Sequence, residues 1–133
     1  MAKITGLAQT TLSVDDDLGS AKDIRNDVTN YDFSTPYGVQ EITGVDKSAT
    51  ERQLLLADYS GTLNGVVNPS TDRQHAVMSG DLRVPRTITH TVSSQTLAAE
   101  VLLTDYKWTR ASGGELTYAT PFSLQDGTQP NWT

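Results

Sequence analysis

The stretch ERQLLLADYSGTLNGVVN, residues 51–68, decides the fold, because it is compatible with either a capped helix or a long strand. A helix that starts at Ser48 would gain a capping box from Glu51, which satisfies free backbone N–H groups at the helix start. Gly61 and Gly65 oppose the helix, since a glycine inside a helix costs about 1 kcal/mol relative to alanine.

The same stretch alternates at a period of two residues. One face carries no charge, and it consists of Leu55, Ala57, Tyr59, Gly61, Leu63, Gly65 and Val67. The other face is polar through its middle, which is typical of a half-buried strand. Asn64-Gly65 is also a strong hairpin signal, but only Val66 and Val67 follow it before Asn68-Pro69 ends the run. We therefore predict one long strand over residues 51–68.

Short alternating runs predict further strands on both sides of this stretch. They cover residues 10–14, 27–34 and 86–93, with a late hairpin whose arms are 96–110 and 115–124. A short strand or a turn is predicted over residues 37–50. In the hairpin, Trp108 should pair with Leu116 or Tyr118, and Pro121 should end the second arm or place it at a sheet edge.

One short helix is predicted within residues 69–80, with Ser70 or Thr71 as its N-cap and Gly80 closing its C-terminus. The predicted fold is therefore mainly β: an antiparallel β-sandwich or partial barrel with one short flanking α-helix. We expect one domain over residues 1–133. Loop or arm segments should cover 15–27 and 68–85, and an extended tail should cover 125–133, with Trp132 as an anchor on a neighbour.

Composition narrows the function. The 133-residue chain has no cysteine and a formal net charge of −6, which argues against a nucleic-acid-binding surface because phosphate contacts need Lys and Arg. Residues 1–60 hold ten acids and five bases, and the remainder hold six acids and five bases. The sequence has no apolar run of membrane-spanning length and no signal-peptide apolar region, so we expect a soluble protein without a membrane partner.

No motif predicts catalysis or cofactor binding. The acid cluster Asp15–Asp17 lacks the spacing of a calcium loop. His75 and His90 are the only histidines, and a structural role is expected for His90. A G-x-S-x-G elbow, a P-loop and a G-x-G-x-x-G motif are all missing from the sequence. We expect no enzyme activity, no metal site and no cofactor.

The predicted strands offer more edge than one small domain readily pairs with itself. Exposed edges favour pairing with another chain, and a head-to-tail contact whose rotation closes gives a ring. A self-contained sandwich with protected edges is the alternative.

Two long segments resemble a known family. NDVTNYDFSTPYGVQEITGVDKSATERQLLLADYSGTLNGVVN (26–68) and RTITHTVSSQTLAAEVLLTDYKWTRASGGELTYATPFSLQDGTQPNWT (86–133) are similar to tail tube proteins, or major tail proteins, of long-tailed bacteriophages. The resemblance is closest to phages that infect actinobacteria. It implies a tail tube-like fold completed by oligomerisation, in which hexameric rings stack into a hollow tube that delivers DNA.

The resemblance also implies partners and a place in the particle. The partners would be further copies of the chain, a tape-measure protein, tail terminator and baseplate or distal tail proteins, and double-stranded DNA that passes without specific binding. The protein would lie in the virion tail, after assembly in the host cytoplasm. An acidic bore would repel phosphates, and the candidate lumen-facing acids are Asp58, Glu100 and Asp105. Segments 15–27 and 68–85 would contact successive rings.

Other functions remain open at this point. A capsid decoration protein or a head–tail connector would have a similar size and composition. A monomeric β-sandwich binding module is a further alternative.

Overall fold

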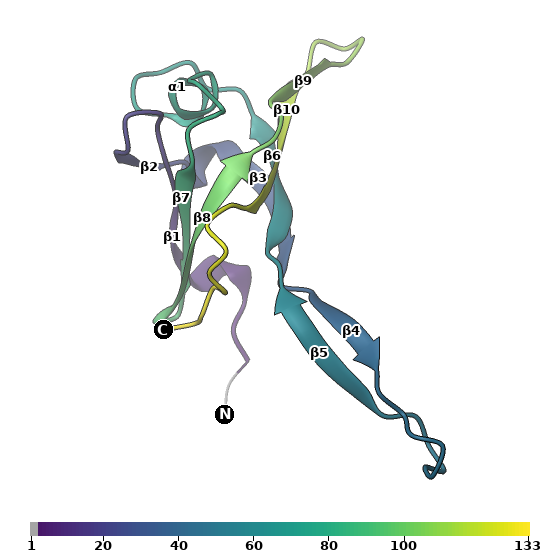
Figure 1. Cartoon of the computed structure of the whole chain (residues 1–133). Helices are drawn as coiled ribbons and strands as arrows, with labels where there is room; N and C mark the ends of the chain where they lie inside the picture. The colour runs from purple at the N-terminus through teal and green to yellow at the C-terminus, as the bar shows by residue number, and fades with distance from the viewer. Residues whose placement is uncertain (1–2) are drawn as a thin grey trace.

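The computed structural model describes residues 3–133 and is built almost entirely from antiparallel strands (Figure 1). The strands are β1 (Gln9–Asp15), β2 (Ala21–Asp23), β3 (Val28–Ser34), β4 (Tyr37–Glu41), β5 (Arg52–Ala57), β6 (Ser60–Val66), β7 (Arg86–Val92), β8 (Gln95–Leu103), β9 (Lys107–Arg110) and β10 (Leu116–Leu124). The helical elements are α1 (Gln74–Met78) and the 3₁₀ helices η1 (Gly6–Ala8) and η2 (Arg25–Asp27). The predicted mainly β fold with one short α-helix is confirmed.

The main sheet has the strand order β2-β1-β7-β8-β10-β6-β3, and β9 also pairs with β10. Strand β10 is the turning point of this sheet. Strand β6 lies along one side of β10, whereas the other side is shared by β9 near its start and β8 at its end. Because β8 and β9 follow each other in the chain, the sheet bends at residues 104–106. The bend produces two halves, β2-β1-β7-β8 and β9-β10-β6-β3.

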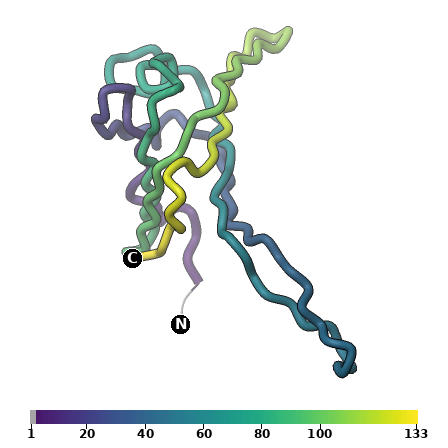
Figure 2. Tube along the Cα trace, viewed as in Figure 1, coloured from purple at the N-terminus to yellow at the C-terminus, as the bar shows by residue number. Residues whose placement is uncertain are grey.

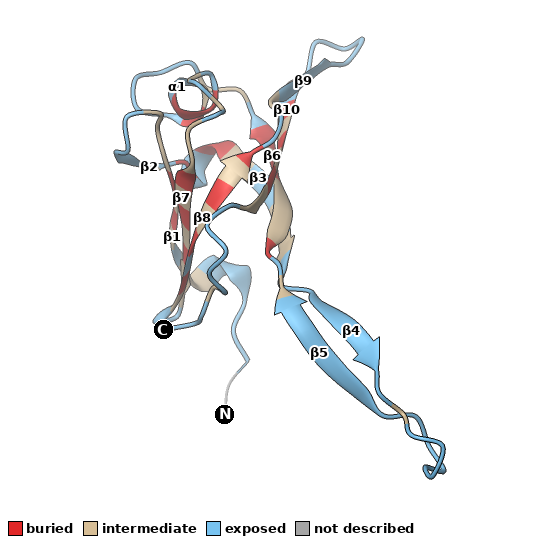
Figure 3. Cartoon of the chain, viewed as in Figure 1, coloured by how far each residue is buried: buried red, intermediate tan, exposed pale blue. Residues whose placement is uncertain are grey.

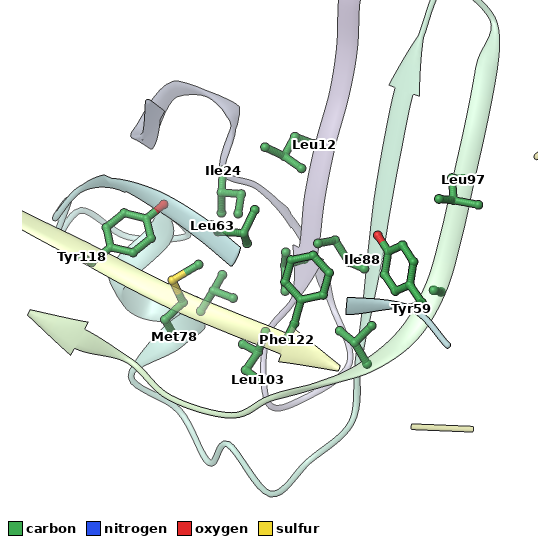
Figure 4. Close-up of a cluster of buried hydrophobic side chains, with 14 residues drawn as sticks. Leu12, Ile24, Tyr59, Leu63, Met78, Ile88, Leu97, Leu103, Tyr118 and Phe122 are labelled. Atoms are coloured by element: carbon green, nitrogen blue, oxygen red, sulfur yellow. The ribbon is translucent and has the colours of Figure 1, made fainter. Parts of the chain in front are cut away.

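One cluster of buried apolar side chains fills the space between the two halves (Figure 4). Alternate residues of the central strands point into it, among them Leu63, Ile88 and Phe122, each at most 1% exposed. Burying a side chain of this size completely stabilises the fold by about 1.5–3 kcal/mol. Figure 3 shows the same alternation, with buried positions along β7, β8 and β10.

The prediction of one continuous strand over residues 51–68 is wrong. The stretch forms two strands in different sheets, β5 beside β4 and β6 in the main sheet. The break falls at Asp58 and Tyr59. Tyr59 is fully buried, and its hydroxyl lies 2.7 Å from Nε2 of His90. The Asp58 N–H donates to the carbonyl of Pro36 at 2.8 Å, so the chain that leaves the body after β3 returns to it immediately before β6.

Neither the capped helix nor the hairpin turn at Asn64-Gly65 forms, because β6 continues through both residues as a strand. Its two glycines are needed for close approach to neighbouring backbone. A Cβ added at Gly61 would collide with the carbonyl oxygen of Asp32, and one added at Gly65 would collide with that of Asp27. The glycines that argued against a helix therefore let β3 and the preceding turn lie tightly on β6.

The predicted late hairpin is confirmed, although its first arm is two strands, β8 and β9. Trp108 pairs with Tyr118, as predicted. The prediction that the second arm ends or becomes an edge at Pro121 is wrong, since β10 continues past it between two neighbours. Pro121 faces the gap between β8 and β9, where its carbonyl accepts the Thr104 N–H at 3.0 Å. No donor is required from the proline at that gap.

The predicted helix exists, but it is shorter and its predicted caps are wrong. Its N-cap is Arg73 and its C-cap is Ser79, rather than Ser70 or Thr71 and Gly80. The buried carboxylate of Asp27, in η2, accepts the Gln74 N–H at 3.3 Å and the side-chain amide of Asn68 at 2.8 Å. A distant acid thus satisfies the helix start, where negative charge is favourable.

Arg86, at the start of β7, fastens the segment around α1 to the body. Its guanidinium is buried and donates to three backbone carbonyls: Val77 at 2.8 Å, Asp81 at 2.9 Å and Asp15 at 3.0 Å. Burial lowers the pKa of Arg86, and the nearby acids oppose that shift. Both loop segments predicted from the sequence, 15–27 and 68–85, are therefore held against the body at one end of the molecule.

Gly61→Ala should destabilise the protein strongly, because its Cβ would meet the Asp32 backbone and the Phe122 ring. Overpacking of this kind costs about 1–3 kcal/mol, so we expect a loss at the upper end of that range in urea unfolding. Gly6→Ala is the matched control, since nothing lies within 4 Å of its added Cβ. Equal stability of the two variants would contradict the close approach of β3 and β6.

Candidate assembly interface

Strands β4 and β5 form a hairpin that projects from the body, and within residues 3–133 they pair only with each other (Figures 1 and 2). We call residues 37–57 the arm. Every arm residue from 37 to 56 is exposed apart from Thr43 (Figure 3). At its base, the Tyr37 hydroxyl accepts the side-chain amide of Gln129 at 2.6 Å. The arm contributes no residue to the buried core cluster.

The arm carries an unusual number of exposed apolar side chains. They include Val45, fully exposed, Leu54 at 61%, Leu55 at 49% and Leu56 at 89%. A two-stranded hairpin is marginally stable alone, and contiguous exposed apolar surface usually marks an interaction site. The arm is therefore a candidate surface for contact with another chain.

The sequence contained one signal for the arm, the run of three consecutive leucines, which the prediction of an alternating strand did not take into account. In a half-buried strand only alternate residues are apolar, whereas Leu54, Leu55 and Leu56 are consecutive. Consecutive apolar residues indicate cover on both faces of a strand. Within residues 3–133 nothing supplies that cover.

The half-sheet β9-β10-β6-β3 ends in two open edges. Among the described residues, β3 pairs only with β6, and β9 pairs only with β10. The outer edges of both strands therefore present unpaired backbone groups, which are templates for strand addition. Direction alternates through the four strands, so β3 runs antiparallel to β9.

The outward face of this half-sheet is lined mostly by small polar side chains. The paired registers align on one face Lys107, Thr109, Thr117, Ala119, Pro121, Ser123, Ser60, Thr62, Asn64, Val66, Asn30, Asp32 and Ser34. The opposite face carries Tyr118, Phe122 and Leu63 into the core. The outward face thus has one acid, one base and otherwise uncharged residues.

The structure does not bring the three candidate lumen acids together. Asp58 is exposed at the junction of arm and body, and its carboxylate accepts the Tyr59 N–H at 2.8 Å. Asp105 is exposed just before β9. Glu100 is half-buried on β8, in the other half of the molecule, where it accepts the Thr87 hydroxyl at 2.8 Å.

Both histidines contact aromatic side chains of their own chain. His90 is buried, with the rings of Tyr31 and Phe33 stacked beside it at 5.3 and 4.8 Å between centroids. Burial lowers the pKa of His90 to about 4. His75 lies on α1, with Nδ1 2.9 Å from the hydroxyl of Tyr106. The burial and contacts of His90 agree with the structural role expected from the sequence.

Residues 3–133 contain no group of three or more His, Cys, Asp or Glu residues that could hold a metal ion. They also contain no helix that is long and apolar enough to cross a membrane.

The C-terminal tail is anchored on its own chain. Trp132 pairs with Leu97 of β8, and its ring lies 6.1 Å from that of Phe33. Thr133 and Thr96 exchange two backbone hydrogen bonds of 2.9 Å. In this structure Trp132 therefore anchors the tail on β8 of the same molecule, and contact of the tail with an adjacent copy stays a prediction.

Comparison with solved structures places this arrangement among known folds. One similar chain comes from the tail of an empty gene transfer agent particle refined with C6 symmetry, with a TM-score of 0.73 and 14% identity, covering 98% of this chain and 99% of that one. The chains share one fold. A chain from the virion of a native gene transfer agent particle matches with a TM-score of 0.68, 14% identity and the same coverage. No family model and no curated protein matches the sequence.

Replacing residues 38–56 by a short Gly/Ser linker should leave the body folded. The arm buries nothing in the core, and a shorter loop costs less closure entropy, so the free energy of unfolding should change by no more than about 1 kcal/mol. Urea unfolding followed by tryptophan fluorescence measures this, since Trp108 and Trp132 both remain. A loss of cooperative unfolding would show that the arm is part of the folding unit.

Acid should destabilise the protein through His90. Its folded pKa of about 4 lies below the ordinary value of 6.5, so its stabilising contribution is complete above pH 6.5 and is lost as the pH falls from 6.5 towards 4. His90→Gln keeps an amide beside Tyr59 but does not titrate. We expect a smaller difference between the unfolding free energies at pH 7 and pH 4.5 for this variant than for the wild type. Equal differences would contradict the prediction.

Proposed function

We propose that this chain is the tail tube protein of a long-tailed phage or phage-like particle, a structural virion protein without enzyme activity. Its copies form hexameric rings, and the rings stack into a hollow tube that conducts DNA. The similarity to a C6-symmetric gene transfer agent tail over 98% of the chain supports this function. A closer relation to actinobacteriophage tails remains a prediction from the sequence.

The observation that carries the proposal is the pair of open edges on the half-sheet β9-β10-β6-β3. In a cyclic ring all copies share one direction, and β3 is antiparallel to β9 within each copy. Pairing β3 of one copy with β9 of the next therefore continues the alternation without interruption. Ring closure removes every open edge of this half-sheet, as in other closed barrels.

In such a ring the outward face of the half-sheet becomes the inner wall, because the chain's own core covers the other face. The wall carries Asp32 and Lys107 among hydroxyl and amide side chains. Asp58 and Asp105 lie two residues before the first outward-facing residues of β6 and β9, so both border the wall. Glu100 lies on the other half and would face away from the bore.

Stacking of rings requires a second contact besides the seam within each ring, and the arm supplies it. It projects from one end of the body, whereas α1 and the two loop segments, 15–27 and 68–85, lie at the other end (Figure 1). Copies arranged head to tail would place the apolar arm of one ring against the loop end of the next. Tape-measure, terminator and baseplate or distal tail proteins are the expected partners along and at the ends of the tube.

Electron microscopy of the concentrated protein tests this function. We expect six-fold rings or tubes from the wild type. Leu54→Ser/Leu56→Ser should remain folded, since both side chains are exposed, but should yield no tubes. Leu18→Ser, at a leucine that is 87% exposed in segment 15–27, tests that segment in the same way.

Other outcomes would point to other functions. Trimers or capsid binding would indicate a decoration protein, and labelling of the protein at the neck of virions would indicate a connector. A protein that stays monomeric and is absent from the tail shaft of particles would favour a binding module and contradict the proposal.

A further inference from the structure

The two open edge strands carry complementary side chains. On the outward face, β3 presents Asp32 and β9 presents Lys107. Both are exposed, and neither belongs to an ion pair within residues 3–133. On the inward face, β3 carries Tyr31 and β9 carries Trp108, which is 49% exposed. The two edges of one chain thus match each other in charge on one face and in aromatic character on the other.

We propose that β3 of one copy pairs antiparallel with β9 of a second copy in the register that sets Asp32 opposite Lys107. This inference rests on the proposed ring and specifies how its seam is formed. The same register sets Asn30 opposite Thr109 on the outward face. On the inward face it sets Tyr31 opposite Trp108. Directly opposed side chains of these kinds stabilise antiparallel pairs.

Neighbouring registers lose this complementarity. A shift of one residue exchanges the faces, so that a charged residue opposes an aromatic one. A shift of two residues in one direction sets Asp32 opposite Asp105, a like-charge pair. A shift of two in the other direction sets Asp32 opposite Thr109 and leaves Lys107 opposite Ser34. Charge alone therefore selects one register among these.

A groove beside β3 provides space for the tryptophan of the second copy. It has a volume of about 460 Å³ and lies between η1, β1 and β3. Leu7, which is 97% exposed, contributes to its lining together with Leu12 and Tyr31. The lining also includes the polar residues Gln9, Arg25, Thr29 and Asn30. An aromatic side chain seated in a pocket is a frequent anchor of protein interfaces, and Arg25 and the amides could border its ring. Trp108 of the paired β9 would lie next to this groove.

Charge reversal tests the seam. Asp32→Lys alone and Lys107→Asp alone should each weaken ring association about ten-fold or more, because each places like charges opposite one another. The double variant should restore assembly towards the wild-type level, as measured by sedimentation and electron microscopy. The control is Asp126→Lys, which makes the same charge change as Asp32→Lys but in the C-terminal tail. It should assemble normally. Single variants that assemble like the wild type, or a double variant that stays defective, would overturn the register.

Disulfide crosslinking tests the register independently, because the chain has no cysteine of its own. Asn30→Cys/Thr109→Cys should crosslink assembled copies into a ladder on non-reducing gels. Within one chain the two strands are three strand spacings, about 14 Å, apart, so the bond must join two copies. Ser34→Cys/Thr109→Cys is the control, since it lies four residues, about 13 Å, out of register.

Failure of the proposed register can be distinguished from failure of the proposed function. Rings without the Asn30–Thr109 crosslink, or with the control crosslink instead, would overturn the proposed register and leave the tube function intact. If the cysteine-free wild type forms neither rings nor tubes and is absent from the tail shaft, the proposed function itself fails.

Discussion

The hydrogen bond between Tyr59 and His90 is the contact on which the shape of the molecule depends. Tyr59 directly precedes β6 in one half of the sheet, and His90 lies on β7 in the other, with 2.7 Å between hydroxyl and Nε2. A buried hydroxyl or imidazole is costly unless it is paired. The chain must therefore turn inward at Tyr59, and the residues before it cannot continue within the body. The arm is the consequence of this anchor.

This anchor separates the parts of the chain that are satisfied internally from those that are not. The core, the two terminal guanidinium nitrogens of Arg86 and the tail around Trp132 find partners within the molecule. The arm leucines and the outer edges of β3 and β9 find none within residues 3–133. Unsatisfied apolar surface and unsatisfied backbone thus lie on separate elements, which suits a subunit with two kinds of neighbour, one beside it and one along an axis.

Alternation in the sequence predicted the faces of strands well and their ends poorly. It paired Trp108 correctly, because its partner Tyr118 lies in the next strand of the same hairpin. The ends depend on distant partners. Asp27 caps α1 from 47 residues away, and Pro121 remains inside β10 because it faces a gap between two strands. Of the proposed wall, sequence reasoning named Asp58 and Asp105 but missed Asp32, whose alternation with Tyr31 and Phe33 was visible.

The proposed seam has a consequence for the electrostatics of the bore. If Asp32 of each copy engages Lys107 of the next, the single base of the wall is neutralised, and Asp58 and Asp105 remain as the free charges at its borders. Such a wall combines short hydroxyl and amide groups with a modest excess of acids. DNA would release no condensed counterions on contact with it, because the wall offers no unpaired Lys or Arg to neutralise phosphates. DNA would then meet a polar surface that hydrates it and repels it weakly, which is what rapid passage requires.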